Sequence, residues 1–305
     1  RQKTIGKNFT HDTLEYQLRP NSSISDMYGL IKLHKATSPI RPICTGYTAM
    51  CAKPKQFLKS FLEPLTKNLK YLVNSTRDFS HRFKLEKDKF IPSKHTLVSY
   101  DIVSLYTKVN TNRAISIIQD EIYKCSETFF TEKDSFGRPL PIPDRENFRR
   151  YLHGVLTQFN FFRTPIGIFR QKSGLAMGSC LSALISNIFI NKLEHEIVDN
   201  FIRKGDVITW LRYADDIIAI VKNRSVDKIA KKLNSWDGRL EFTTEVMTDH
   251  LKFLDCEIYV QNSKLEFKPH RKNGSETVIS NFNESLISKK FLINNIFTAL
   301  HRDKY

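Results

Sequence analysis

The chain has 305 residues, of which 40% are hydrophobic, so it is long and apolar enough to bury a substantial core and is not disordered as a whole. Lys and Arg outnumber Asp and Glu by 48 to 32, a formal net charge of +16. No apolar run approaches the roughly 20 residues that span a bilayer, so no membrane partner is expected. The five scattered cysteines predict no disulfide framework and favour a reducing compartment over secretion.

The positive charge is concentrated at the two ends of the chain. Residues 1–100 carry 18 basic and 7 acidic side chains, and residues 268–305 carry 7 and 3, whereas the stretch between them carries 23 and 22. Basic flanks around a nearly neutral body favour a polyanionic partner such as nucleic acid. The alternative is a basic surface that has no partner.

Segments with helix or strand spacing follow one another without internal repeats. In chain order they are an apolar run at 28–31, a helix at 49–72, a strand at 95–100, a helix at 114–123, a charged surface insertion at 126–148, a hairpin at 159–170, a helix at 181–197, strands at 207–213 and 217–221, a helix at 225–236, and strands near 240–246, 251–260 and 264–268. Short strands and helices that do not alternate regularly predict an α+β fold.

Three aspartates stand at predicted strand ends. Asp101 follows one apolar strand, and Asp215 and Asp216 occupy the tight turn between two others. Aspartate is ordinary in a turn, but strands of one sheet would bring these carboxylates together, where they repel one another. A hard divalent cation offsets that repulsion, and Mg²⁺, with Mn²⁺ as a substitute, prefers carboxylates together with substrate phosphates. The pattern therefore predicts two-metal phosphoryl transfer.

Tyr106 comes five residues after Asp101. A ring there would lie beneath the sugar of a nucleotide whose phosphates meet the metal ions. Such a ring would clash with a 2′-hydroxyl and favour deoxynucleotides. The alternative is a buried tyrosine after a strand, with no contact to a substrate.

Three ordered segments resemble the conserved motifs of reverse transcriptases. They are SYDIVSLY at 99–106, GLAMGSCLS at 174–182 and YADD at 213–216. Within that family the chain resembles the Penelope-like element group, through YGLIKLHK at 28–35 followed by Arg-Pro-Ile at 41–43, the AMGS form of the second motif, and Phe-Leu-Asp at 253–255. The resemblance extends over roughly residues 28–300, and the ordered set is far more specific than any one motif.

The resemblance implies a right-hand polymerase with fingers, a palm that holds an antiparallel sheet, and the start of a helical thumb. The expected ranges are 1–95 for the fingers-rich part, 96–270 for the palm with its insertion at 126–148, and 271–305 for the thumb. The implied activity is RNA-directed DNA synthesis by a Penelope-like retroelement related to telomerase. The implied partners are an RNA template, a DNA primer and deoxynucleoside triphosphates, with nuclear localisation after transit through the cytoplasm. A GIY-YIG endonuclease, common in the group, is expected to be separate or missing, since nothing after Lys290 provides one.

The resemblance also implies roles for individual residues. Asp101 and Asp215 would bind the metal ions with Asp216 beside them, and Ile102 would contribute its backbone carbonyl. The residues expected to contact the nucleotide are Lys32, Lys35, Arg41, Tyr106, Met177 and Gly178, and those expected to form the primer grip are Phe253, Leu254 and Asp255.

The chain departs from the broader reverse-transcriptase pattern at three places. Met177 stands where many relatives have glutamine, and Ala183 where proline is common. The strand at 240–245 lacks the lysine that often protonates pyrophosphate, which leaves the general acid unassigned, with Lys252 as a candidate. Two alternatives stay open at this stage. One is an RNA-dependent RNA polymerase, which Tyr106 disfavours, and the other is a catalytically silent nucleic-acid-binding scaffold with a polymerase fold.

Overall fold

The computed structural model describes residues 23–31, 40–44, 51–124 and 144–270. Its centre is an antiparallel sheet in the order β6-β7-β3-β8. The strands are β3 (His95–Ile102), β6 (Val207–Tyr213), β7 (Asp216–Lys222) and β8 (Phe242–Val246). β7 is apolar along almost its whole length because both faces of the sheet are covered. The predicted strands at 95–100, 207–213 and 217–221 are confirmed.

Helices cover one face of this sheet and form the larger core. They are α2 (Ala52–Thr66), α5 (Thr111–Lys124), α6 (Arg145–His153), α7 (Ser182–Leu193), α8 (Asp199–Arg203) and α9 (Val226–Asn234). From β3, Val98, Tyr100 and Ile102 point into this core, and the ring of Tyr100 stacks on that of Trp210 with centroids 5.4 Å apart. The helices predicted at 49–72, 114–123, 181–197 and 225–236 are therefore present, with shorter bounds at 49–72 and 225–236.

The opposite face of the sheet carries a second, smaller core. It is covered by α3 (Thr76–Glu86) and by a three-stranded sheet of β9 (His250–Phe253), β10 (Cys256–Gln261) and β11 (Lys264–Pro269). Phe79 of α3 packs against Phe253 with ring centroids 4.7 Å apart. The single strand predicted at 251–260 is wrong, because a turn at Leu254, whose φ is +53°, divides it into β9 and β10.

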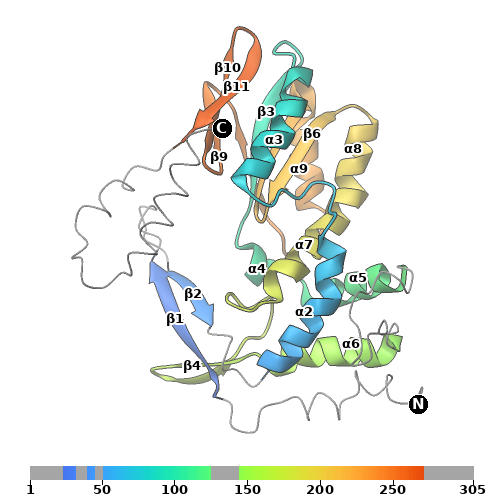
Figure 1. Ribbon diagram of the computed structural model, residues 1–305, viewed down its shortest axis with the longest axis vertical. Coiled ribbons are helices and arrows are strands. Elements are labelled where there is room, and N and C mark those ends of the chain that lie inside the picture. Colours follow the sequence, from blue (N-terminus) through green and yellow to red (C-terminus); the bar gives the residue numbers. More distant parts are fainter. Residues whose placement is uncertain (1–22, 32–39, 45–50, 125–143, 271–305) are drawn as a thin grey trace, which may run out of the picture.

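A third sheet lies at the other end of the molecule, in the order β2-β1-β4-β5 (Figure 1). β1 (Ser25–Ile31) and β2 (Ile40–Cys44) are antiparallel, and β1 runs parallel to β4 (Phe161–Thr164), which pairs with β5 (Gly167–Arg170). The predicted hairpin at 159–170 is confirmed. The sheet thus joins strands from the N-terminal part of the chain to strands from the range assigned to the palm.

The insertion predicted at 126–148 is wrong at its C-terminal end. α6 begins at Arg145 behind Asp144, whose carboxylate accepts the Asn147 N–H, and Phe148 is fully buried. An aromatic side chain on the inner side of a helix belongs to the core and not to a surface loop. The rest of the insertion, and residues 271–305 of the expected thumb, lie outside the described residues, so the three domain ranges stay predictions.

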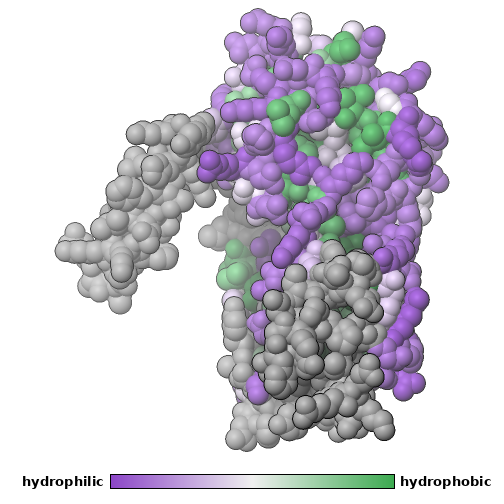
Figure 2. Space-filling model, turned by 45° about the vertical axis from the view of Figure 1, so that its right-hand side comes forward, coloured by the Kyte–Doolittle hydropathy of each residue, from purple (hydrophilic) through white to green (hydrophobic). Residues whose placement is uncertain are grey.

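The outer surface is mostly hydrophilic over the described elements in the view of Figure 2, with small separate hydrophobic areas. Such scattered apolar side chains are normal for a folded chain. None of the helices within the described ranges is long and apolar enough to cross a membrane. Within the described ranges, Cys44, Cys51, Cys180 and Cys256 are free thiols.

Candidate active site

The pairing of β3 with β7 places Asp101 directly opposite Asp216. Side chains alternate between the two faces of a strand, and Leu97 and Ile218 both point into the smaller core. Asp101 lies four residues from Leu97, and Asp216 two residues from Ile218, so both carboxylates point to that same face. Both side chains are exposed. Two acidic groups from distant parts of the sequence therefore share one open end of the sheet.

Asp215 lies in the tight turn that joins β6 to β7 and is half-buried. The turn is closed by Ala214, whose φ is +53°, a conformation that residues with a side chain seldom adopt. The carbonyl of Asp215 accepts a hydrogen bond from the Ile102 N–H at 3.1 Å, which ties the turn to the end of β3. The expected meeting of Asp101 with the turn at 215–216 is thus confirmed for the backbone.

A divalent cation would find part of its donor set here. Within the described ranges, no group of three or more His, Cys, Asp and Glu side chains is arranged to hold a metal ion, so the expected three-carboxylate cluster is not formed. Mg²⁺, however, is usually bound through one or two carboxylates together with water and substrate phosphates. The facing carboxylates of Asp101 and Asp216, with Asp215 beside them, fit that incomplete protein donor set.

Tyr106 lies in the short helix α4 (Leu105–Lys108) that follows β3, and its side chain is half-buried. Burial raises the pKa of its hydroxyl above the ordinary value. The negative charge of Asp215 raises the pKa further, and the guanidinium of Arg41 lowers it. The Tyr106 hydroxyl therefore lies close enough to Asp215, a candidate metal ligand, and to Arg41, a candidate triphosphate ligand, for both charges to act on it.

The loop at 174–178 connects β2 with Tyr106. The Leu175 N–H donates to the Tyr106 carbonyl at 2.6 Å, and the Cys44 N–H donates to the Met177 carbonyl at 2.8 Å. Met177 and Gly178 therefore lie against the strand that carries Arg41. Lys32 and Lys35, predicted to act with Arg41, lie outside the described residues.

The glycines of this loop serve the protein's own packing. Gly174 and Gly178 have φ values of +76° and +98°, and a Cβ at either would meet backbone, that of Thr107 and of Cys44 respectively. The nearest neighbours of both glycines are protein backbone, although the resemblance implies that Gly178 contacts the nucleotide. The two serines of this segment also bond locally: Ser182 donates to the Ala176 carbonyl at 2.6 Å, and the Ser179 hydroxyl accepts from the Leu181 N–H at 3.4 Å, so neither provides a side-chain cap for α7.

Replacing Gly178 by alanine is expected to lower the free energy of unfolding by about 2–3 kcal/mol, because the left-handed conformation and the contact with the Cys44 carbonyl both oppose a side chain. Urea denaturation measures the change. The matched control is Gly238→Ala, where a Cβ meets nothing within 4 Å and φ is not positive. Its expected effect is within about 0.5 kcal/mol, and equal effects of the two changes would contradict the assignment.

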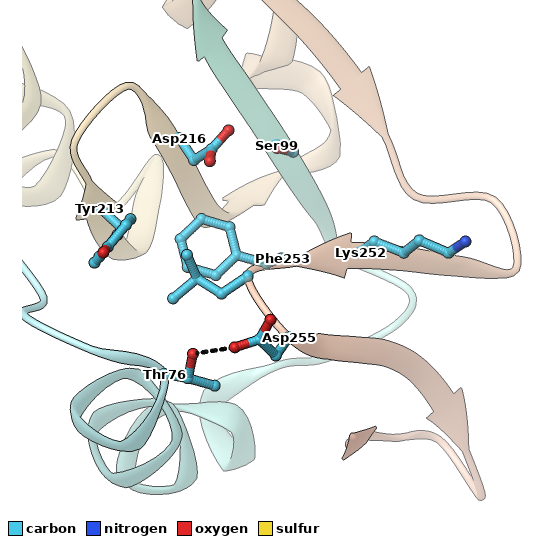
Figure 3. Close-up of a pocket in the computed structure, with 8 residues that line it drawn as sticks. Thr76, Ser99, Tyr213, Asp216, Lys252, Phe253 and Asp255 are labelled. Carbon is cyan, nitrogen blue, oxygen red and sulfur yellow. Dashed lines mark hydrogen bonds between the residues drawn. The ribbon is translucent and has the colours of Figure 1, made fainter. Parts of the chain in front are cut away.

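The predicted primer-grip residues line, together with Asp216, a cavity of about 480 Å³. Figure 3 shows Asp216 and Ser99 on the side of the central sheet, and the turn after β9 facing them. Asp255 accepts a hydrogen bond from the Thr76 hydroxyl at 2.9 Å, so α3 fixes this turn (Figure 3). Phe253 is buried against Phe79 and anchors the hairpin.

Lys252 was the candidate proton donor for pyrophosphate. It borders the same cavity, but its ammonium group points away from Asp216 (Figure 3). The role of Lys252 therefore gains no support from the structure. Thr76, which sequence reasoning missed, donates a hydrogen bond to Asp255 of the predicted primer grip.

The sequence matches, over residues 33–268, the family described as Reverse transcriptase (RNA-dependent DNA polymerase). The chain belongs to the reverse transcriptase family. Its α+β architecture is that of a right-hand polymerase, as expected from the motifs. The enzymes of this family are RNA-directed DNA polymerases, which are nucleotidyltransferases. No curated protein matches the sequence.

Solved polymerase structures share this reverse transcriptase's fold at low sequence identity. Candida tropicalis telomerase truncated from its C-terminal domain superposes with a TM-score of 0.59 at 17% identity, over 82% of this chain and 56% of the telomerase chain. Candida albicans telomerase in complex with a TWJ fragment of telomeric RNA gives 0.61 at 13% identity, over 95% and 52%. The BmCPV RNA-dependent RNA polymerase at elongation state gives 0.51 at 11%, over 87% and 23%. The chain spans about half the length of the telomerases that it resembles.

Proposed function

We propose that this protein is the reverse transcriptase of a Penelope-like retroelement, which adds deoxynucleotides to a DNA primer on an RNA template. The observation that carries the proposal is the register of β3 and β7, which sets Asp101 opposite Asp216 on one exposed face, next to the turn that holds Asp215. The side chains of Asp101 and Asp216 lie exposed at the adjoining ends of buried strands, where a metal ion and a substrate can reach them. Paired carboxylates of this kind suit phosphoryl transfer.

The carboxylates of Asp101 and Asp215, with Asp216 and the Ile102 carbonyl beside them, would hold Mg²⁺ or Mn²⁺. Such ions, when bound, lower the pKa of an attacking hydroxyl and neutralise charge on a leaving pyrophosphate. Arg41 is exposed on β2 near Tyr106. Its guanidinium fork suits the oxygens of an incoming triphosphate, and Lys32 and Lys35 would add positive charge to the same phosphates.

Tyr106 would limit the sugar pocket and so select deoxynucleotides. The backbone of Met177 and Gly178 lies against β2 and would border the nucleotide. The turn formed by Phe253, Leu254 and Asp255 faces Asp216 across the cavity, where the 3′ end of a primer would be held. A methionine in place of glutamine at position 177 offers the nucleotide an apolar contact instead of a hydrogen bond.

The assignment to the Penelope-like group depends on sequence segments that few other polymerases would combine. They are YGLIKLHK before Arg-Pro-Ile, the AMGS form of the second motif, and Phe-Leu-Asp at 253–255. Membership of this group would also imply that the protein acts in the nucleus after transit through the cytoplasm, and that an endonuclease is separate or missing. The telomerase fold shared by the chain agrees with this placement, and the strongly basic N-terminal part suits an RNA–DNA duplex.

Two alternative functions have their own supporting observations. The fold likeness to the BmCPV enzyme would suit an RNA-dependent RNA polymerase, but a ring at Tyr106 leaves no room for a 2′-hydroxyl. The lack of a three-carboxylate cluster within the described ranges would suit a silent nucleic-acid-binding scaffold. That scaffold, however, would have no reason to keep Asp101 and Asp216 face to face.

Primer extension decides among the three functions. The protein is incubated with a DNA primer annealed to an RNA template, Mg²⁺, and either deoxynucleoside or ribonucleoside triphosphates. Extension with deoxynucleotides alone is the expected result. Preferential use of ribonucleotides would establish the RNA polymerase instead. Binding of the duplex without extension, in either Mg²⁺ or Mn²⁺, would establish the scaffold.

A further inference from the structure

A fully buried ion pair lies beneath the turn that carries Asp215. Arg212 of β6 and Glu194, which begins the π turn η6 (Glu194–Val198) after α7, are both 0% exposed. The Arg212 Nε donates to one oxygen of Glu194 at 2.8 Å, and Nη2 donates to the other at 3.2 Å. The indole N–H of Trp210 donates to the same carboxylate at 3.1 Å. Three N–H groups thus donate to the Glu194 carboxylate, and both charged side chains are shielded from water.

Stability alone does not explain this pair. Removing two charges from water is costly, and well-packed apolar side chains of similar size often stabilise a protein as much or more. The neighbours Trp210 and Leu211 on β6 follow that apolar solution, and both are buried. A charged pair buried in such a strand therefore suggests that its hydrogen bonds are needed to fix the position of a neighbouring group.

The remaining nitrogen of the guanidinium, Nη1, links the buried pair to the turn that carries Asp215. Nη1 donates to the Ala214 carbonyl at 3.3 Å and to the Asn187 side-chain oxygen at 2.9 Å. Ala214 is the residue of the turn with a φ of +53°, so its peptide group is held in a conformation that the chain would otherwise leave. Arg212 points to the same face as Trp210, into the larger core, and therefore reaches the turn from the face opposite Asp101 and Asp216.

We propose that Arg212 is a positioning residue for Asp215. Glu194 and Asn187 fix the guanidinium, the guanidinium fixes the Ala214 carbonyl, and that peptide group sets the direction in which Asp215 leaves the turn. Arg212 contacts neither nucleotide nor primer in this role. The catalytic consequence rests on the proposed polymerase function, whereas the geometric claim stands on the buried contacts themselves.

The test uses Arg212→Lys, which keeps the buried positive charge but has one ammonium group in place of a fork that reaches Glu194 and Ala214 at once. The activity-independent readouts are hydrogen exchange of the Ile102 amide, which is bonded to the Asp215 carbonyl, and the affinity for Mn²⁺ alone. We expect Ile102 to exchange at least 10-fold faster while Ile218 and Ile220 in the middle of β7 are unchanged. We also expect at least 5-fold weaker Mn²⁺ binding.

Arg113→Lys is the matched control, because Arg113 likewise holds a backbone carbonyl and a carboxylate, those of Trp236 and Asp237, away from the turn. In this control we expect the hydrogen-exchange rate of the Ile102 amide and the affinity for Mn²⁺ to equal those of the unmodified protein. If Arg212→Lys does not fold, the double change Arg212→Met with Glu194→Leu replaces the pair by apolar side chains and is measured in the same way.

Unchanged Ile102 exchange and Mn²⁺ affinity in a folded variant would overturn the positioning role, as would failure of both variants to fold. In primer extension, a 10-fold lower kcat with an unchanged KM for deoxynucleotide supports the role. If the unmodified protein does not extend a primer, the proposed polymerase function fails by itself, and the exchange experiment still decides whether Arg212 holds the turn.

Discussion

Replacing Asp215 by asparagine is expected to lower the rate of primer extension by at least about 10³-fold, about 4 kcal/mol in the activation barrier. The reason is that the amide keeps the size of the side chain but removes the charge that a divalent cation requires. The backbone bond from Ile102 to the Asp215 carbonyl is independent of the side chain, so the thermal midpoint should stay within a few degrees. Single-turnover extension and thermal unfolding measure the two quantities.

The same loss is expected for Asp101→Asn, because Asp101 lies opposite Asp216 on the same face. Asp120→Asn is the matched control. Asp120 is exposed on α5 and pairs with Arg145 at 2.7 Å, an interaction of exposed groups that is worth little. Full extension activity in Asp215→Asn, with Asp120→Asn behaving identically, would refute the assignment of the catalytic carboxylates.

Replacing Tyr106 by valine is expected to lower the preference for deoxynucleotides over ribonucleotides by about 100-fold, about 2.7 kcal/mol, because the ring that would clash with a 2′-hydroxyl is removed. The ratio of kcat/KM for the two nucleotides measures the effect. The preference should not depend on pH between 6 and 9. The pKa of the Tyr106 hydroxyl is raised above its ordinary value, so the group stays neutral throughout that range.

Tyr106→Phe separates the ring from its hydroxyl. Phenylalanine keeps the steric barrier, so the preference for deoxynucleotides should stay within about 3-fold of the original value. A loss as large as that in Tyr106→Val would mean that the hydroxyl, and not the ring, selects the sugar. Unchanged selectivity in Tyr106→Val would remove Tyr106 from the nucleotide site.

β3 and β7 were predictable because their apolar pattern is strong. In β3 the buried stretch is followed by Asp101, and in β7 Asp216 precedes five consecutive apolar residues, a pattern typical of a strand covered on both faces. The position of the candidate site could be predicted by pairing these strands. Its details could not, because a sequence does not show that Asp216 is the direct partner of Asp101. Nor does it show that, within the described ranges, the side chains form no three-carboxylate cluster.

Other elements carried too weak a pattern to be found. α3 has only Phe79 and Phe83 buried among mainly polar residues, and its role depends on long-range packing against Phe253. The division between β9 and β10 depends on a positive φ at Leu254, where no glycine marks the turn. Arg212 did carry a signal, a charge within an apolar strand, but its partner Glu194 lies on another element and could not be read from spacing.

The loop at 174–178 has a consequence for fidelity. It is bonded to the strand that bears Arg41 through Cys44 and Met177, and to Tyr106 through Leu175. If Arg41 holds the triphosphate and Tyr106 checks the sugar, as the proposed function requires, a mispaired base that displaces this loop would disturb both contacts. Rejection of a wrong base and rejection of a wrong sugar would then be mechanically linked, so that a change in the loop which makes the polymerase more error-prone would also make it less strict about ribose.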